Sequence, residues 1–183
     1  AVDEAHCVSQ WGHDFRSSYR RISRVVSLLR NRPIVAAFTA TATAEVRDDI
    51  IKLLELNNPK VFISGFDRKN LKIIIEKGVN KKNYILDYIN SNKDESGIIY
   101  CSTRKEVDSL YDLLISKGLE VEKYHAGLND EYRKEAQESF IYDKVNIIIA
   151  TNAFGMGIDK PNVRYVIHYN MPKNIEGYYQ EIG

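Results

Sequence analysis

The sequence predicts an α/β protein made of two parallel-sheet domains. Short β-rich runs alternate with helical patterns through the 183 residues, which is typical of parallel sheets flanked by helices. A polar stretch at 65–70 interrupts this alternation and has the composition of a linker. We therefore expect a first domain over residues 1–64, a linker over 65–70 and a second domain over 71–183.

The first domain is expected to contain two helices and two strands. Apolar residues at helical spacing predict a helix over 18–31, which Pro33 ends. Val46, Ile50 and Leu54 predict another helix, for which Thr43 is a candidate N-cap. Continuous apolar runs predict buried strands at 34–38 and 61–63.

The second domain is expected to repeat this alternation. Thr103 and Glu106 have the spacing of a capping box, and Gly118 ends the helix that they begin. Asn174 is the expected cap of a last helix. Further helices are expected around residues 84–89 and 132–140, and strands at 71–76, 97–101, 121–124, 145–150 and 163–169.

The composition sets limits on the kind of protein. Hydrophobic residues make up 44% and charged residues 28%, as in soluble globular proteins, and no apolar run has the length of a membrane span. The formal charge is +1, so a nucleic-acid partner would have to bind to a local patch. Cys7 and Cys101 are too few for a zinc site or a disulfide framework, and we expect buried thiols in a reducing, cytoplasmic compartment (nucleoid-associated in a bacterium).

An acidic pair opens the chain, where a parallel strand is expected to end. Ligands of open α/β sheets bind at such ends. Asp3 could hold Mg²⁺ through its water shell, and Glu4 could orient or deprotonate an attacking water molecule. The simpler interpretation is an acidic pair at a helix start on a solvated face.

A loop rich in aromatic and polar residues follows the acidic pair. Trp11, His13 and Phe15 offer rings on which nucleic-acid bases can stack, and Arg16 offers a partner for phosphate. The alternative is that Trp11 or Phe15 packs beneath the loop. A second candidate is the segment 39–43, where small hydroxyl residues suit a switch that exchanges hydrogen bonds, or else only a helix entry.

Six segments in order resemble the motifs of RecQ helicases of superfamily 2. They are Asp-Glu-Ala-His at 3–6 with its aromatic loop, Phe-Thr-Ala-Thr-Ala at 38–42, residues 97–104, Tyr-His-Ala-Gly-Leu at 124–128, residues 150–164 and Tyr-Tyr-Gln-Glu-Ile-Gly at 178–183. The aromatic loop distinguishes RecQ helicases from DEAH-box RNA helicases. The resemblance implies two RecA-like domains, both incomplete, with the first represented by its C-terminal half.

The resemblance also implies roles for individual residues. Catalysis would involve Asp3, Glu4 and His6, and coupling to ATP would involve Thr39, Thr41, Gly157, Asp159 and Gln180. The residues implied in binding single-stranded and partly duplex DNA are Trp11, His13, Phe15, Arg16, Thr103, Arg104, His125, Gly127, Thr151, Phe154, Gly155 and Met156.

The expected function is ATP- and Mg²⁺-dependent unwinding of DNA, with the 3′ to 5′ polarity that is usual in the family. The sequence departs from the family pattern, because it has no Gly-x-x-x-x-Gly-Lys-Thr phosphate loop and lacks the arginines expected after Gly183. We therefore expect the isolated chain to be inactive. The alternative is a non-catalytic module for nucleic-acid binding or assembly.

Overall fold

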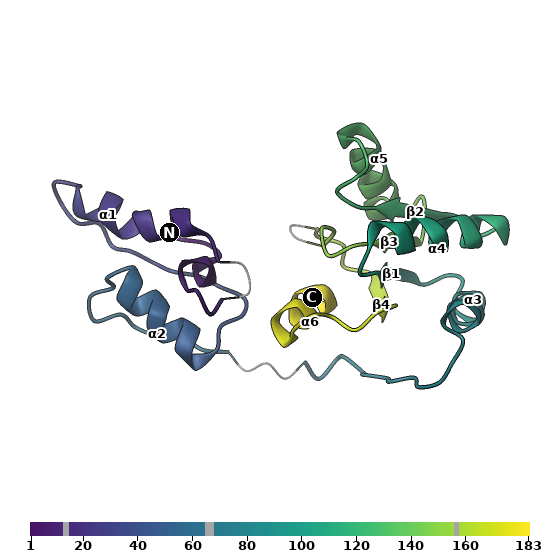
Figure 1. Ribbon diagram of the computed structural model, residues 1–183, viewed down its shortest axis with the longest axis horizontal. Helices are drawn as coiled ribbons and strands as arrows, with labels where there is room; N and C mark the ends of the chain where they lie inside the picture. Colours follow the sequence, from purple (N-terminus) through teal and green to yellow (C-terminus); the bar gives the residue numbers. More distant parts are fainter. Residues whose placement is uncertain (13–14, 65–67, 156–157) are drawn as a thin grey trace. The chain divides into compact units, whose positions relative to one another are not determined.

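A computed structural model of the protein describes residues 1–12, 15–64, 68–155 and 158–183. These residues belong to two compact units, unit 1 over residues 1–73 and unit 2 over residues 74–183. In Figure 1, unit 1 runs from purple to blue and unit 2 from teal to yellow. Each unit has its own hydrophobic core.

The regular elements in the described part of unit 1 are helices, joined by long irregular segments. Its elements are the 3₁₀-helices Ala5–Val8 (η1) and Ser17–Arg20 (η2) and the α-helices Arg21–Ser27 (α1) and Ala44–Leu53 (α2). The Thr43 side chain accepts a hydrogen bond from the backbone of Val46, which confirms it as the N-cap of α2. The core consists of Val2, Ala5, Val8, Val46, Ile50 and Leu54.

The strands predicted at 34–38, 61–63 and 71–76 are wrong. Strand pairing in the described part of unit 1 is a single parallel bridge between Val2 and Ala37. Ile34 is 99% and Phe62 is 89% exposed. An extended segment becomes a strand only when a neighbour pairs with its backbone groups, and an apolar run in the sequence does not supply that neighbour.

The helix predicted over 18–31 is shorter than expected. Its first turn is the 3₁₀-helix η2, and α1 ends at Ser27. Tyr19 and Ile22 pack against the core, whereas Val25 and Leu29 are exposed. Because most helical stability comes from packing of the apolar face, residues without a core contact do not extend the helix.

Unit 2 contains a four-stranded parallel sheet. Its strands are Ser96–Tyr100 (β1), Val121–Tyr124 (β2), Ile147–Ala150 (β3) and Val163–His168 (β4). They lie in the order β2-β3-β1-β4, and every neighbouring pair is parallel. The prediction of a parallel sheet is confirmed here, and the strand ends differ from the predicted ones by at most two residues.

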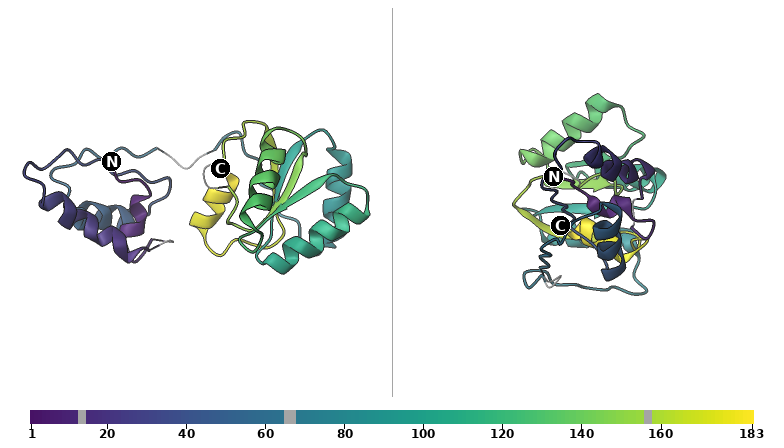
Figure 2. Two further views of the ribbon diagram at one scale, coloured as in Figure 1. Left: turned by 90° about the horizontal axis from the view of Figure 1, so that it is seen from above. Right: turned by 90° about the vertical axis from the view of Figure 1, so that its left-hand side faces the viewer.

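Helices cover both faces of this sheet, as Figure 2 shows. They are Lys81–Ser91 (α3), Arg104–Ser116 (α4) and Asp130–Ile141 (α5), and a further helix, Ile175–Ile182 (α6), follows β4. Alternate residues of β1 enter different cores, because successive side chains in a strand point to opposite faces: Ile99 packs in one cluster with α3 and α4, and Ile98 in another with Phe140 of α5. The predicted capping box at Thr103 and the Asn174 cap are both confirmed. Among the described residues, none of the helices has the length and apolar character needed to cross a membrane.

Candidate nucleotide and nucleic-acid sites

The acidic segment of unit 1 follows directly on the bridge to the segment around Ala37. The Val2 N–H donates to the Ala36 carbonyl over 2.7 Å, and the Ala5 N–H donates to the Phe38 carbonyl over 2.9 Å. Between these anchors, Glu4 has the left-handed backbone angles φ 48° and ψ 43°, which are uncommon for a residue with a Cβ. Backbone pairing thus holds the two exposed carboxylates of Asp3 and Glu4 beside the segment that carries Thr39.

His6 joins the acidic pair to this threonine segment. Its buried ring places Nδ1 at 2.9 Å from Thr39 Oγ1 and 3.2 Å from Glu4 Oε2. The Thr39 hydroxyl donates to the Thr41 carbonyl over 2.9 Å, so it must accept from the His6 ring. Hydrogen bonding therefore assigns the proton to Nδ1.

Four of the residues predicted to act on ATP consequently lie in one cluster of unit 1, namely Glu4, His6, Thr39 and Thr41. The Thr41 hydroxyl is buried and makes no hydrogen bond within the described part of the chain. A buried hydroxyl without a partner is costly, so this position favours a rearrangement that would supply one.

The aromatic loop presents one strongly exposed ring. Trp11 is 78% exposed, and Phe15 is partly exposed with the Arg20 guanidinium 5.2 Å from its ring centre. The Trp11 N–H donates to Ser9 Oγ over 3.1 Å, and Ser9 Oγ donates to Asp49 Oδ2 on α2 over 2.6 Å. Trp11 is thus not a core residue, and its turn is tied to the helix that follows the threonine segment.

Of the two other residues predicted in this loop, Arg16 and His13, the structure describes only Arg16. Arg16 is exposed, and its backbone N–H donates to the Cys7 carbonyl over 2.9 Å. His13 lies outside the described residues. The sequence did not point to Asp49, because a helical acid 40 residues from Ser9 has no local signal that marks it.

Unit 2 gathers its predicted DNA-binding residues at the carboxyl ends of its strands. Thr103 follows β1, His125 follows β2 and Thr151 follows β3, and parallel strands end at the same edge. The strand ends are joined there, since the Thr151 N–H donates to the Tyr124 carbonyl over 3.2 Å. The fold therefore brings together residues that the sequence separates by 20 or more positions.

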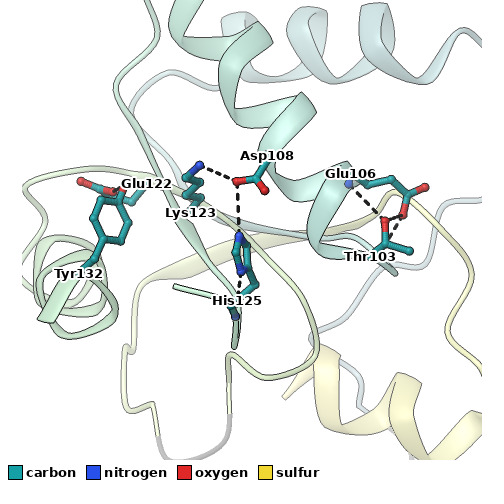
Figure 3. A network of polar contacts seen from close by, with 8 residues as sticks. Thr103, Glu106, Asp108, Glu122, Lys123, His125 and Tyr132 are labelled. Carbon is teal, nitrogen blue, oxygen red and sulfur yellow. Dashed lines mark hydrogen bonds and ion pairs between the residues drawn. The ribbon is translucent and has the colours of Figure 1, made fainter. Parts of the chain in front are cut away.

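Thr103 caps the N-terminus of α4 at this edge. Its hydroxyl accepts from the Glu106 N–H over 3.2 Å, and its own N–H donates to Glu106 Oε2 over 3.1 Å (Figure 3). Asn170 donates to the other oxygen of Glu106 over 3.0 Å. The hydrogen bonds from Asn170 and then Thr103 lower the pKa of Glu106. The adjacent Arg104 is exposed.

The loop after β3 is partly buried. The Phe154 ring lies in the core, 5.0 Å from Tyr124 and 5.9 Å from Phe140 between ring centres. Gly155 has φ 116°, and a Cβ there would lie 2.6 Å from the Tyr100 hydroxyl. In this arrangement Phe154 supports the loop and its ring is not available to DNA, whereas Thr151 stands at the strand end. Met156 and Gly157 lie outside the described residues.

The end of this loop and helix α6 hold the last predicted residues. Asp159 and Gln180 are both exposed. Lys160, next to Asp159, is buried and pairs with Asp143 over 2.5 Å. His168 of β4 pairs with Glu181 of α6 over 2.9 Å, so the helix that carries Gln180 is tied to the end of the sheet.

Comparison with known proteins identifies the family of the chain. Residues 80–183 match the model of the helicase conserved C-terminal domain. Over its full length the chain is 49% identical to the ATP-dependent DNA helicase RecQ of Bacillus subtilis and 49% identical to the RecQ-like DNA helicase blm-1 of Caenorhabditis elegans. It spans 31% and 19% of these two proteins.

A solved structure of Saccharomyces cerevisiae Dbp5 bound to RNA and ADP–BeF₃ has a similar fold. The TM-score is 0.76 at 24% identity, over 98% of this chain and 48% of Dbp5. With the parallel sheet of unit 2, this likeness confirms the predicted RecA-like α/β class. The chain belongs to the helicase conserved C-terminal domain family and is similar along its whole length to RecQ helicases.

Proposed function

We propose that this chain is the central part of an ATP-dependent DNA helicase that unwinds DNA with 3′ to 5′ polarity. The observation that carries this proposal is the contact of His6 with both Glu4 and Thr39. His6 thereby links the Glu4 carboxylate, which is suited to activating water, with the threonine segment 39–43, whose hydroxyl groups are suited to exchanging hydrogen-bond partners. Relatives that cover the whole chain are named ATP-dependent DNA helicases, which supports the same function.

The acidic pair would act on a nucleotide. Glu4 would orient the attacking water molecule, with His6 holding its carboxylate, and Asp3 would bind Mg²⁺ through water. Bound ATP and Mg²⁺ supply the phosphoryl group and neutralise its charge. Asp3 and Glu4 are exposed at the carboxyl end of the bridged segment. This fits Mg²⁺, which usually keeps several waters and takes one or two carboxylates with substrate phosphates.

Coupling would run through the threonine segment. A shift of Thr39 away from His6 would leave Nδ1 of the ring to Glu4 alone among these partners, and the buried hydroxyl of Thr41 is near enough in sequence to take part in the exchange. Gly157, Asp159 and Gln180 are proposed to take part in coupling to ATP. Hydrolysis would thereby alter the contacts that hold DNA.

DNA contacts are proposed on both units. The exposed Trp11 and Phe15 rings would stack on bases, and Arg16 would bind phosphate. His13, outside the described residues, is proposed to bind DNA as well. At the strand edge of unit 2, the exposed Thr103 and Arg104 would meet the backbone of single-stranded or partly duplex DNA. Gly127 and Gly155 would line this path, and the buried His125, Thr151 and Phe154 would support it. Met156, outside the described residues, is proposed as a further DNA-binding residue.

A second candidate function is a non-catalytic module for nucleic-acid binding or assembly. The observation that favours it is the exposure of groups suited to nucleic acid, the Trp11 ring and Arg104. Both candidates predict that the purified 183-residue chain shows no DNA-stimulated ATP hydrolysis above background. The two candidates differ for the complete protein, because only a helicase would hydrolyse ATP in response to DNA. We place that protein in the cytoplasm.

The decisive test is a pair of conservative substitutions in the complete protein. Glu4→Gln should leave ATP binding nearly intact and lower the hydrolysis rate by at least about a hundredfold, the scale of a general base. Asp3→Asn should instead raise the Mg²⁺ concentration needed for half-maximal rate. A Glu4→Gln protein that hydrolyses ATP at a near-normal rate would show that the acidic pair is only structural.

A further inference from the structure

Asp108 lies at the centre of a polar network to which the motifs gave no role. It is one turn after Arg104 on α4, so the two side chains share a face of the helix. One oxygen, Oδ1, accepts from Lys123 Nζ at 2.5 Å and lies 3.4 Å from His125 Nε2 (Figure 3). Asp108 therefore connects the start of α4 with the end of β2.

The carboxylate fixes the state of the His125 ring. The Gly127 N–H donates to His125 Nδ1 over 3.1 Å, so Nδ1 carries no proton. The proton is then on Nε2, which points at Asp108. Hydrogen bonds from Lys123 and then His125 lower the pKa of Asp108, which keeps it an acceptor at neutral pH. Because His125 is only 5% exposed, its ring serves the protein itself and not a ligand.

His125 in turn closes the turn at residues 125–128. Its carbonyl accepts from the Leu128 N–H over 3.1 Å, while its ring accepts from the Gly127 N–H. The Arg104 side chain lies across this turn, because a Cβ at Gly127 would be 3.1 Å from both Cδ and Nη1 of Arg104. A side chain at position 127 would press on Arg104, which would have to shift by a few tenths of an ångström, so Arg104 rests on the bare backbone of the turn.

We propose that Asp108 is a positioning residue for DNA binding. Through the His125 ring it holds the turn 125–128 in the shape that supports Arg104, and so directs the Arg104 guanidinium toward a DNA phosphate. This inference rests on the proposed function, since it assumes that Arg104 binds phosphate. It adds a residue that does not touch DNA and that the resemblance did not include.

The salt dependence of DNA binding tests this role. Each lost phosphate contact reduces the slope of log K against log salt by about 0.7 for single strands. The affinity of the complete protein for a fluorescent single-stranded oligonucleotide would be measured over a series of salt concentrations. Arg104→Ala should reduce the slope by this amount, Asp108→Ala should reduce it equally, and the double substitution should reduce it no further.

Two controls separate positioning from charge and from folding. Asp112→Ala removes the same charge from an exposed position on the same helix and should leave the slope unchanged. Asp108→Asn keeps an oxygen that accepts from His125 Nε2 and should stay close to the wild-type slope. Thermal melting of each variant shows whether it is folded.

A rescue variant keeps the test informative if Asp108→Ala is unstable. Asn at position 125 can accept from the N–H two residues later in an Asx turn, without help from Asp108. His125→Asn should therefore restore the slope in the Asp108→Ala background. A wild-type slope for Asp108→Ala beside a reduced slope for Arg104→Ala would overturn the positioning role alone. An unchanged slope for Arg104→Ala would overturn both this inference and the proposed phosphate contact.

Discussion

Similar apolar runs differ in strand pairing and burial between the two units. In unit 2, the run ending at Ala150 is the buried strand β3, with a parallel neighbour on each side. In unit 1, the run 34–38 makes a single bridge through Ala37, and Ile34 is solvent-exposed. A β-rich run therefore indicates an extended backbone, whereas the strand itself depends on neighbours that saturate its hydrogen bonds.

The candidate sites of the two units also differ in what holds their residues together. In unit 1, side-chain contacts join the acidic segment to the threonine segment, and His6 makes the main ones, to Glu4 and Thr39. In unit 2 the sheet sets the spacing, and side chains such as Asp108 and Glu106 adjust the loops that leave it. Substitutions should consequently affect stability most in unit 2 and coupling most in unit 1.

The largest expected effect on stability is in the core of unit 2. Phe140 is fully buried beneath the sheet, so Phe140→Ala should lower the free energy of unfolding by about 3–5 kcal/mol in urea denaturation. Ile34→Ala in unit 1 should change it by less than about 0.5 kcal/mol. Equal losses for the two variants would show that the run 34–38 is buried in solution and would remove the contrast between the units.

Helix capping gives a smaller effect and a closer comparison. Thr43 and Thr103 both cap helices, and only Thr103 belongs to a reciprocal capping box. Each substitution by Ala should cost about 1 kcal/mol, with Thr103→Ala the more costly because it also frees Glu106. The same urea measurement checks this order, and a larger loss for Thr43→Ala would contradict it.

Acid should weaken unit 2 through Glu106. Its pKa is lowered from the ordinary value of 4.5 by hydrogen bonds from Asn170 and Thr103. A carboxyl with a lowered pKa stabilises the fold above its unfolded pKa, and this contribution is lost as pH falls through the folded pKa. Stability should therefore decline below about pH 4.5, and Asn170→Ala should make that decline shallower. An identical pH profile for both proteins would exclude Glu106 as its source.

The smallest effect on stability and the clearest effect on coupling are expected at Trp11. Because its ring is solvent-exposed, Trp11→Ala should change the free energy of unfolding by less than about 0.5 kcal/mol. In the complete protein it should keep basal ATP hydrolysis and lose stimulation by DNA, since stacking contributes about 1–3 kcal/mol per base.

Phe15→Ala and Ser9→Ala extend this measurement. Phe15→Ala removes the second ring of the loop, and Ser9→Ala keeps the Trp11 ring but removes the hydroxyl that joins its turn to Asp49. Basal rate, stimulated rate and melting temperature would be measured on the same proteins. If stimulation survives in both aromatic variants, these rings do not couple DNA binding to ATP hydrolysis.

The sequence by itself determined the elements whose signals are local. The Thr103 and Asn174 caps and the parallel alternation of unit 2 follow from short-range patterns, and the structure confirms them. The aromatic loop was predicted as a group, and the exposure of Trp11 agrees with a ring available for stacking. Local patterns suffice for these features because capping and amphipathic spacing involve residues within a few positions of each other.

Only the tertiary structure decided which distant residues meet. It joined His6 to Thr39 over 33 positions, Ser9 to Asp49 over 40 and Asp108 to His125 over 17, and it removed the strands predicted in unit 1. Hydrogen bonds between distant side chains depend on where the backbone carries them, and a strand depends on the segment beside it. Neither the partner of a polar group nor the neighbour of a strand is contained in the residue pattern of a single segment.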